Sequence, residues 1–100
     1  MIVSFHKDAL SEFQEAGVWY EEQRLNLGIE FIQAIEQAIA LILENPGRFR
    51  MVEKDIHLFR LHRFPYYVFY HWKEGHDRVR ILAIMHQKRR PGYWRSRIKA

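Results

Sequence analysis

The chain has 100 residues, of which 48% are hydrophobic and 15% aromatic, so extensive disorder is excluded and one domain spanning residues 1–100 is predicted. Without cysteine it can form neither a disulfide framework nor a cysteine-based zinc site. No apolar run reaches the roughly 20 residues of a membrane-spanning helix. The N-terminus becomes charged too early for a signal peptide. We therefore expect a cytoplasmic protein with no membrane partner.

Charge is distributed unevenly along the chain. The formal net charge is +4, yet eight of the 16 lysines and arginines lie from Arg78 onward and no acidic residue follows Asp77. Tyr93 and Trp94 interleave with these C-terminal cations, which a merely solubilising tail does not need. The basic C-terminal third therefore indicates an acidic partner, either nucleic acid or an acidic protein surface.

The first half of the chain predicts a strand, Ile2–Phe5, followed by an amphipathic helix over residues 8–23 that Ser4 or Asp8 is placed to cap. Trp19 and Tyr20 near its end are expected to pack in the core or between helices. The apolar face follows a period near 3.6 residues, and glutamates take the other face. The expected buried residues are Ala9, Leu10, Phe13, Ala16, Val18 and Tyr20, and the expected solvent-facing ones are Glu12, Glu15, Glu21 and Glu22.

A second helix ends near Glu44, because Asn45, Pro46 and Gly47 stop it. Gly28, near its start, permits a tight turn or a close helix contact. Two such helices joined by a short loop form an antiparallel helical hairpin. The residues expected on the buried face of the second helix are Phe31, Ile35, Ala38, Ile39 and Ile42.

The apolar period changes to two in the second half, which predicts three strands over residues 56–64, 66–72 and 79–86. Phe69 is expected in the core, while Tyr66 and Tyr70 fit either the core or a base-stacking surface. The element order predicts an α+β fold, with the N-terminal strand and helical hairpin packed on an antiparallel β-meander sheet and a short basic C-terminal helix or tail.

The C-terminal stretch, residues 86–97, contains several residues suited to binding or catalysis. His86 lies where a strand becomes a loop, and Pro91 suits the first turn of a short helix. Trp94 is placed to fold back and pin that helix to the sheet. Arg90 and Arg97 are expected to stay free, and their planar forks suit carboxylate or phosphate.

The histidines lie on strands and turns without a paired spacing, so the sequence predicts no metal site, and no motif implies a cofactor. Strand alternation lets His62 and His86 meet on neighbouring strands, and with Arg60 and Arg89 they would form an acid/base and phosphate-binding set. The scattered histidines are His57, His62, His71, His76 and His86.

Several segments, in the same order along the chain, carry a resemblance to a known family. They are Tyr20 with Leu27, Gly28 and Phe31; Asn45, Pro46 and Gly47 with Phe49; Arg60 with Phe64, Pro65, Tyr66, Val68, Phe69 and Tyr70; and His86, Arg89, Pro91, Trp94 and Arg97. The chain resembles the RelE/ParE superfamily of bacterial toxin–antitoxin toxins, also called plasmid stabilization proteins. The resemblance covers nearly the whole chain and implies a helical hairpin on an antiparallel sheet.

The resemblance implies a toxin that a cognate antitoxin neutralises. RelE-like members cleave messenger RNA in the ribosomal A site, whereas ParE-like members trap DNA gyrase on broken DNA. The nucleases typically carry an arginine directly after the loop, where this chain has Tyr66, and its FPY segment and C-terminal spacing look closer to ParE. We therefore expect a ParE-like toxin that binds gyrase and is not itself an enzyme.

Two alternatives remain open under the same resemblance. One is a ribosome-dependent endoribonuclease acting on mRNA through Arg60, His62, His86 and Arg89. The other is a non-toxic protein of the toxin fold that serves as an antitoxin partner.

The expected surface for target or antitoxin comprises Arg60, Tyr66, His86, Arg89, Arg90, Tyr93, Trp94 and Arg97. The antitoxin is expected to be an acidic or amphipathic segment that docks on the apolar helix pair or a sheet edge, covers the basic tail and forms an oligomer with the toxin. Truncation after Lys88 is expected to abolish toxicity while leaving a folded domain.

Overall fold

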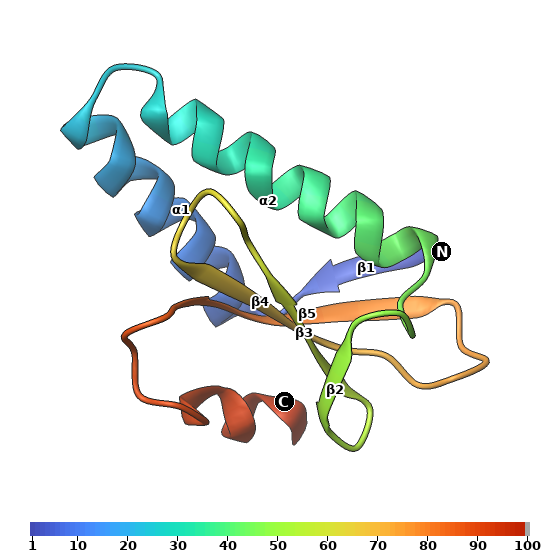
Figure 1. Ribbon diagram of the computed structural model, residues 1–100. Coiled ribbons are helices and arrows are strands. Elements are labelled where there is room, and N and C mark those ends of the chain that lie inside the picture. Colours follow the sequence, from blue (N-terminus) through green and yellow to red (C-terminus); the bar gives the residue numbers. More distant parts are fainter. Residues whose placement is uncertain (100) are drawn as a thin grey trace.

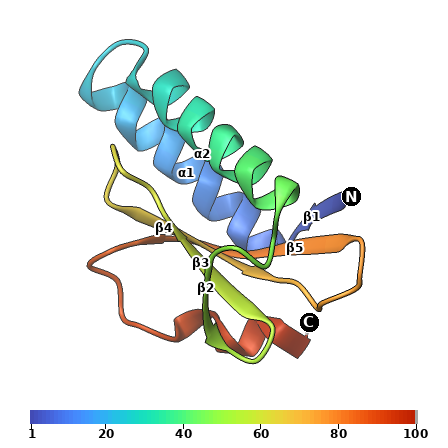
Figure 2. The ribbon, with the colours of Figure 1, turned by 45° about the vertical axis from the view of Figure 1, so that its right-hand side comes forward.

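The structure, a computed structural model, describes residues 1–99 and has the α+β fold that the sequence predicts. Helices α1 and α2 lie side by side on one face of the sheet, and the C-terminal 3₁₀ helix η1 lies on the other (Figures 1 and 2). The elements are β1 (Ile2–Phe5), α1 (Lys7–Gln23), α2 (Leu27–Glu44), β2 (Arg50–Glu53), β3 (Ile56–Arg60), β4 (Tyr66–His71), β5 (Arg78–His86) and η1 (Tyr93–Lys99).

The five strands form one sheet in the order β1-β5-β4-β3-β2. Strands β2 to β5 pair antiparallel, as expected of a meander, but β1 pairs parallel to β5. A parallel pair needs a long crossover connection, and here the crossover includes the helical hairpin. The hairpin is thereby placed against the sheet, where α1 lies along β5.

The sheet has two ends that serve as landmarks below. The tail end holds the β3–β4 turn (61–65) and the segment that leaves β5 (86–90), joined by a hydrogen bond from the Gln87 N–H to the Pro65 carbonyl. The turn end holds the α2–β2 loop (45–49), the β2–β3 turn (54–55) and the β4–β5 turn (72–77). There the Trp72 N–H donates to the Asp55 carbonyl at 2.9 Å.

The main core lies between the hairpin and the sheet, and the predicted face of α2 is confirmed. Tyr20, Phe31 and Phe64 meet there in a cluster of rings with centroids 4.9–5.2 Å apart. Gly28 lets the two helices approach closely, since a Cβ on it would lie only 2.4 Å from the Gly17 carbonyl oxygen. On α2 the fully buried residues are Phe31, Ile35, Ala38 and Ile42, with Ile39 partly buried.

The predicted face of α1 is partly wrong. Leu10, Val18 and Trp19 are 41%, 61% and 55% exposed, whereas Glu12 turns inward with a side chain only 12% exposed. The residues that α1 buries are Ala9, Ala16, Gly17 and Tyr20. Packing against the sheet therefore selects a narrower stripe than hydrophobicity alone indicates.

The start of α1 also differs from expectation, because His6 is the N-cap instead of Ser4 or Asp8. The Asp8 N–H donates to Nδ1 of His6 at 3.0 Å. Burial lowers the pKa of His6, which keeps this nitrogen unprotonated and able to accept.

Two strand predictions need correction. Strand β3 ends at Arg60 and not at residue 64. Leu61 and Phe64 lie in the turn that follows it, yet both still pack in the core. Strand β2 was not predicted, since it is a short edge strand in which Met51 is 55% exposed. Tyr70, left open by the sequence, is fully buried.

Candidate functional site

The tail end of the sheet is organised around the carboxylate of Glu12 on α1. Oε1 accepts from the Ile84 backbone N–H at 3.1 Å and from Nη1 of Arg97 at 2.9 Å. Oε2 accepts from the Tyr93 hydroxyl at 2.6 Å, from Nη2 of Arg97 at 3.0 Å and from Nη1 of Arg89 at 3.3 Å. We call these five residues the Glu12 cluster. It ties α1, β5 and the C-terminal segment together.

Arg97 lies inside this cluster, so the expectation that it stays free is wrong. Its side chain is 10% exposed, and Nη1 also donates to the Leu82 carbonyl at 2.9 Å. Burial alone would lower the pKa of Arg97, but the hydrogen bonds and charge of Glu12 outweigh that effect and raise it. Arg97 is therefore a structural cation that continues the hydrogen bonding of β5 beyond the end of β1.

Tyr93 separates the buried arginine from an exposed one. The guanidinium carbon of Arg97 is 4.9 Å from the Tyr93 ring centroid, and that of Arg89 is 3.9 Å away. Burial, and then the hydrogen bond to Glu12, raise the pKa of Tyr93 well above its ordinary value. Arg89 keeps 52% of its side chain exposed, and Arg90 is also exposed. Arg89 and Arg90 thus present positive charge of the tail to solvent.

Trp94 anchors the tail, as the sequence predicts. It is 3% exposed, and its ring stacks on Phe69 with centroids 4.7 Å apart. This contact belongs to a second core on the sheet face opposite the hairpin. The buried members of that core are Ile56, Phe69, Leu82, Ala83, Met85 and Trp94.

A shallow groove opens beside the Glu12 cluster, between α1 and the end of β5. On its floor the rings of Tyr66 and His86 meet edge to face, with centroids 5.1 Å apart. His86 is held by the Lys88 N–H, which donates to its Nδ1 at 3.0 Å. Burial raises the pKa of Tyr66. The residues that line this tail groove are Glu12, Glu15, Ala16, Trp19, Tyr66, Ile84, His86 and Arg89.

Arg60 and His62, also predicted site residues, lie outside the tail groove. They line a separate cavity in the β3–β4 turn, which Gln87 borders. In the β3–β4 register Arg60 lies opposite Tyr67, whose ring packs against the second core, so Arg60 is on that face of the sheet. His86 contacts the Tyr66 ring on the other face, which the hairpin covers. The sheet therefore separates Arg60 from His86.

The expected meeting of His62 and His86 on neighbouring strands is wrong. His62 follows β3 in a turn, and β4 lies between β3 and β5. The four residues of the predicted nuclease set consequently do not share one cavity.

Sequence reasoning missed Glu12 and Trp19. Glu12 was assigned to the solvent face, yet its spacing from Ala9 and Ala16 places it on the buried stripe of α1. Trp19 was assigned to packing but forms a wall of the tail groove. The helical repeat was enough to place Glu12 on the buried stripe. The role of Glu12 could not be predicted in the same way, because it depends on basic residues more than 70 positions away.

The outer side of the hairpin carries an apolar groove, in keeping with the apolar helix pair expected as a docking surface, although Val18 was expected to be buried. Val18, Ile29 and Ile32 are 61%, 53% and 38% exposed there, and Leu25 in the connecting loop is 76% exposed. The residues that line this hairpin groove are Gln14, Gly17, Val18, Glu21, Gly28, Ile29 and Ile32. Exposed apolar surfaces of this kind are typical of regions that contact other proteins.

Neither a metal cluster nor a membrane helix is found in the described residues. No three His, Asp or Glu side chains gather within residues 1–99 in a way that could hold a metal ion. None of the helices in the same range is long and apolar enough to cross a membrane.

Comparison with known proteins identifies similar families and folds. The family model described as ParE toxin of type II toxin-antitoxin system, parDE, matches residues 3–91. A chain of the chromosomal ParDE TA system from P. aeruginosa superposes with a TM-score of 0.69 at 16% identity, covering 86% of this chain and 95% of that chain. The isolated E. coli RelE toxin gives a TM-score of 0.66 at 16% identity, covering 98% and 96%. Comparison with curated proteins gives no match.

Proposed function

We propose, because the chain belongs to the ParE toxin family of type II toxin–antitoxin systems, that it arrests growth by binding and poisoning DNA gyrase and that a cognate antitoxin neutralises it. The family match over residues 3–91 is the observation that carries this proposal. The fold alone does not indicate whether the target is gyrase or the ribosome, since the ParDE and RelE structures superpose on this chain almost equally well.

The proposed target surface is the tail groove together with the exposed cations that border it. Arg89 and Arg90 supply positive charge, and Tyr66, His86 and Trp19 supply aromatic surface. The Glu12 cluster holds Arg89 against Tyr93, so the charge is presented from a rigid support. Such a surface suits an acidic protein or nucleic-acid partner.

We propose that the protein acts by binding and not by catalysis. RNA cleavage requires a base, an acid and a phosphate-stabilising cation around one phosphate. Arg60 and His86 lie on opposite sides of the sheet, and Tyr66 stands where the nucleases typically carry arginine. This arrangement supports a binding role.

The antitoxin is proposed to cover two surfaces at once, giving a toxin–antitoxin oligomer. An amphipathic segment would place apolar side chains in the hairpin groove, and acidic residues would reach Arg89 and Arg90. Raising the salt concentration should weaken the contacts to these arginines more than the apolar ones. A complex with unchanged affinity in an Arg89→Ala, Arg90→Ala variant would contradict this part of the proposal.

The decisive experiment is a gyrase supercoiling assay with purified, antitoxin-free protein. Wild-type protein should inhibit supercoiling and trap cleaved DNA, whereas Arg89→Ala, Arg90→Ala should need about tenfold more protein for the same inhibition. The matched control, Lys54→Ala, Lys73→Ala, removes two exposed charges at the turn end and should inhibit like the wild type. Folded wild-type protein that leaves gyrase unaffected would overturn the gyrase assignment.

Point substitutions replace truncation in this test. Removing the residues after Lys88 would delete Trp94 from the second core and leave Glu12 without its arginine and tyrosine partners. We therefore expect truncation to destabilise the fold, so a loss of toxicity in the truncated protein would not identify the target surface.

A ribosome-dependent endoribonuclease is the second candidate, favoured by the superposition on RelE over 98% of this chain. It predicts transcripts cleaved during translation and loss of cleavage in a His86→Ala, Arg89→Ala variant. Mapping of transcript 5′ ends in arrested cells tests it, and intact transcripts would reject it. Harmless expression without any antitoxin would instead favour the non-toxic alternative.

A further inference from the structure

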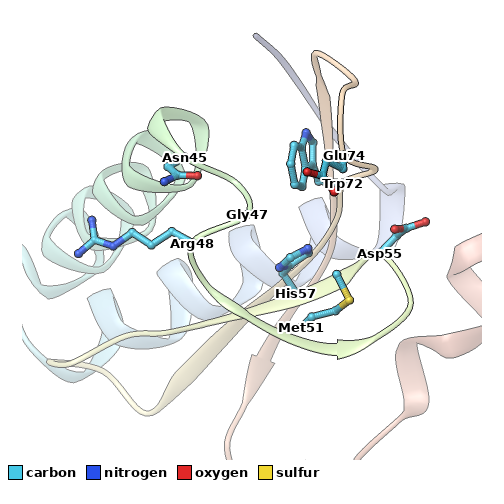
Figure 3. A pocket seen from close by; sticks show the side chains of 8 residues that line it. All are labelled: Asn45, Gly47, Arg48, Met51, Asp55, His57, Trp72 and Glu74. Atoms are coloured by element: carbon cyan, nitrogen blue, oxygen red, sulfur yellow. The ribbon is translucent and has the colours of Figure 1, made fainter.

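A further cavity, of about 380 Å³, lies at the turn end of the sheet, whereas the tail groove lies at the tail end (Figure 3). The α2–β2 loop, strand β2, the turn before β3, His57 of β3 and the turn after β4 border it. The residues that line this His57 cavity are Asn45, Gly47, Arg48, Met51, Asp55, His57, Trp72 and Glu74.

His57, on β3, is fixed in one orientation at the floor of this cavity. It is 2% exposed, and its Nδ1 lies 2.9 Å from the Phe49 carbonyl oxygen. The ring stacks on Tyr70 at 5.1 Å with an interplanar angle of 11°. Tyr70 is held in turn, because its hydroxyl donates to the Pro46 carbonyl at 2.6 Å.

The Phe49 carbonyl determines the tautomer of His57. A carbonyl oxygen can only accept, so Nδ1 must carry the proton and Nε2 of the neutral ring must be an acceptor. Nε2 is buried and has no hydrogen-bond partner within residues 1–99. Buried acceptors are almost always paired in folded proteins, so an unpaired one indicates a missing donor. In Figure 3 one ring nitrogen points toward the space between Trp72 and Asp55.

The charges at the rim indicate the character of that donor. Asp55 and Glu74 both border the cavity, and neither forms an ion pair within the described part of the chain. Arg48 does not neutralise them, because its guanidinium lies 5.5 Å from the Phe49 ring centroid and its side chain points away from His57 in Figure 3. The cavity therefore favours a cation.

We propose that the His57 cavity binds the basic side chain, arginine or lysine, of a protein partner. A guanidinium or ammonium N–H would donate to Nε2 of His57, its charge would face Asp55 and Glu74, and the Trp72 ring would supply a cation–π contact. Met51 is 55% exposed and unbranched, so it can turn aside to admit the group.

A protein partner is the better source of this cation than a free amine, because the cavity lies beside an open sheet edge. Met51 belongs to β2, the outermost strand, whose outer side pairs with no strand in residues 1–99. An extended peptide can add to such an edge and direct alternate side chains to one face. A basic side chain of that peptide would then enter the cavity. This inference does not depend on which target the tail groove binds.

Nuclear magnetic resonance with capped amino acids tests the proposal on the intact protein. Nα-acetyl-arginine methylamide should shift the His57 Nε2 and Trp72 Nε1–H signals in a saturable way, whereas the norleucine analogue should not. An Asp55→Asn, Glu74→Gln variant should bind the arginine probe at least about tenfold more weakly. A Glu22→Gln, Glu36→Gln variant, which removes two exposed carboxylates from the hairpin, should bind it unchanged.

Three results would overturn the proposal. The first is equal binding of the norleucine and arginine probes, and the second is unchanged arginine binding in the Asp55→Asn, Glu74→Gln variant. The third is binding of spermidine about tenfold tighter than the arginine probe, which would assign the cavity to a free amine. A His57→Phe variant with a retained circular dichroism spectrum gives an independent check, since it should lose arginine binding while remaining folded.

Discussion

The two ends of the sheet differ in whether a buried polar side chain has all of its hydrogen-bond partners. At the tail end the carboxylate of Glu12 accepts hydrogen bonds from three side chains and one backbone N–H. At the turn end His57 uses one ring nitrogen, and the other has no partner within residues 1–99. A satisfied network rigidifies the fold, whereas an unpaired acceptor lowers its stability until a donor arrives. The contrast separates a structural clamp from a site open to binding.

The same contrast applies within the basic tail. Arg97 is buried and paired with Glu12, whereas Arg89 makes only a long contact to the same carboxylate and keeps half of its side chain in solvent. Identical residue types eight positions apart in one segment therefore have different roles. One holds the tail to the sheet, and the other presents charge to a partner.

The largest expected effect is that of Glu12→Ala, which breaks the tail-end network. It leaves the buried Arg97 without its counter-charge, and we expect the free energy of unfolding to fall by about 3–5 kcal/mol. Urea denaturation measures this loss. Glu15→Ala on the exposed side of the same helix is the control and should change stability by no more than about 0.5 kcal/mol. Equal losses in the two variants would remove the basis for calling the Glu12 cluster a clamp.

A pair of tyrosine substitutions compares the two ends directly. Tyr93→Phe removes a hydrogen bond to a carboxylate and should destabilise the protein by about 1.5–3 kcal/mol. Tyr70→Phe removes one to the Pro46 carbonyl and should cost about 0.5–1.5 kcal/mol. Chemical denaturation of both variants shows which substitution lowers the free energy of unfolding more. A larger loss for Tyr70→Phe would reverse the assigned importance of the two ends.

Alkaline pH should weaken the fold through the same two tyrosines. Burial raises the pKa of both Tyr70 and Tyr93 well above the ordinary value of 10.0, with the Glu12 hydrogen bond adding to the effect at Tyr93. Above pH 10 the unfolded chain therefore loses protons that the folded protein retains, so stability falls as pH rises. The slope should be about 1.4 kcal/mol per pH unit for each tyrosine.

Denaturation midpoints at several pH values above 10 measure this slope. Tyr70→Phe and Tyr93→Phe should each reduce it by about one tyrosine's share. A slope that neither substitution changes would show that other groups control the alkaline transition.

The smallest effect on stability is expected for Arg89→Ala. The Arg89–Glu12 contact is 3.3 Å long and half exposed, and surface ion pairs of this kind contribute about 0–1 kcal/mol. Denaturation should show a change within that range, while the supercoiling assay shows reduced inhibition. A stability loss as large as that of Glu12→Ala would place Arg89 with Arg97 as part of the clamp.

Local sequence patterns were sufficient for most of the fold. The helical period and the Asn45, Pro46 and Gly47 stop predicted the hairpin, and the period of two predicted β3, β4 and β5. The C-terminal spacing also predicted that Trp94 pins the tail to the sheet, and its ring stacks on Phe69. These features depend on neighbours within a few residues.

The sequence by itself determined both helices of the hairpin, strands β1, β3, β4 and β5, the buried face of α2 and the concentration of positive charge in the C-terminal segment. Only the tertiary structure decided that β1 joins parallel to β5, that Glu12 pairs with Arg97, and that Nε2 of His57 has no hydrogen-bond partner within residues 1–99. The physical reason is the separation along the chain of the residues that interact. Periodicity and turn chemistry act through adjacent residues, whereas a hydrogen-bond partner is set by strand order and register, which bring together groups from distant parts of the chain.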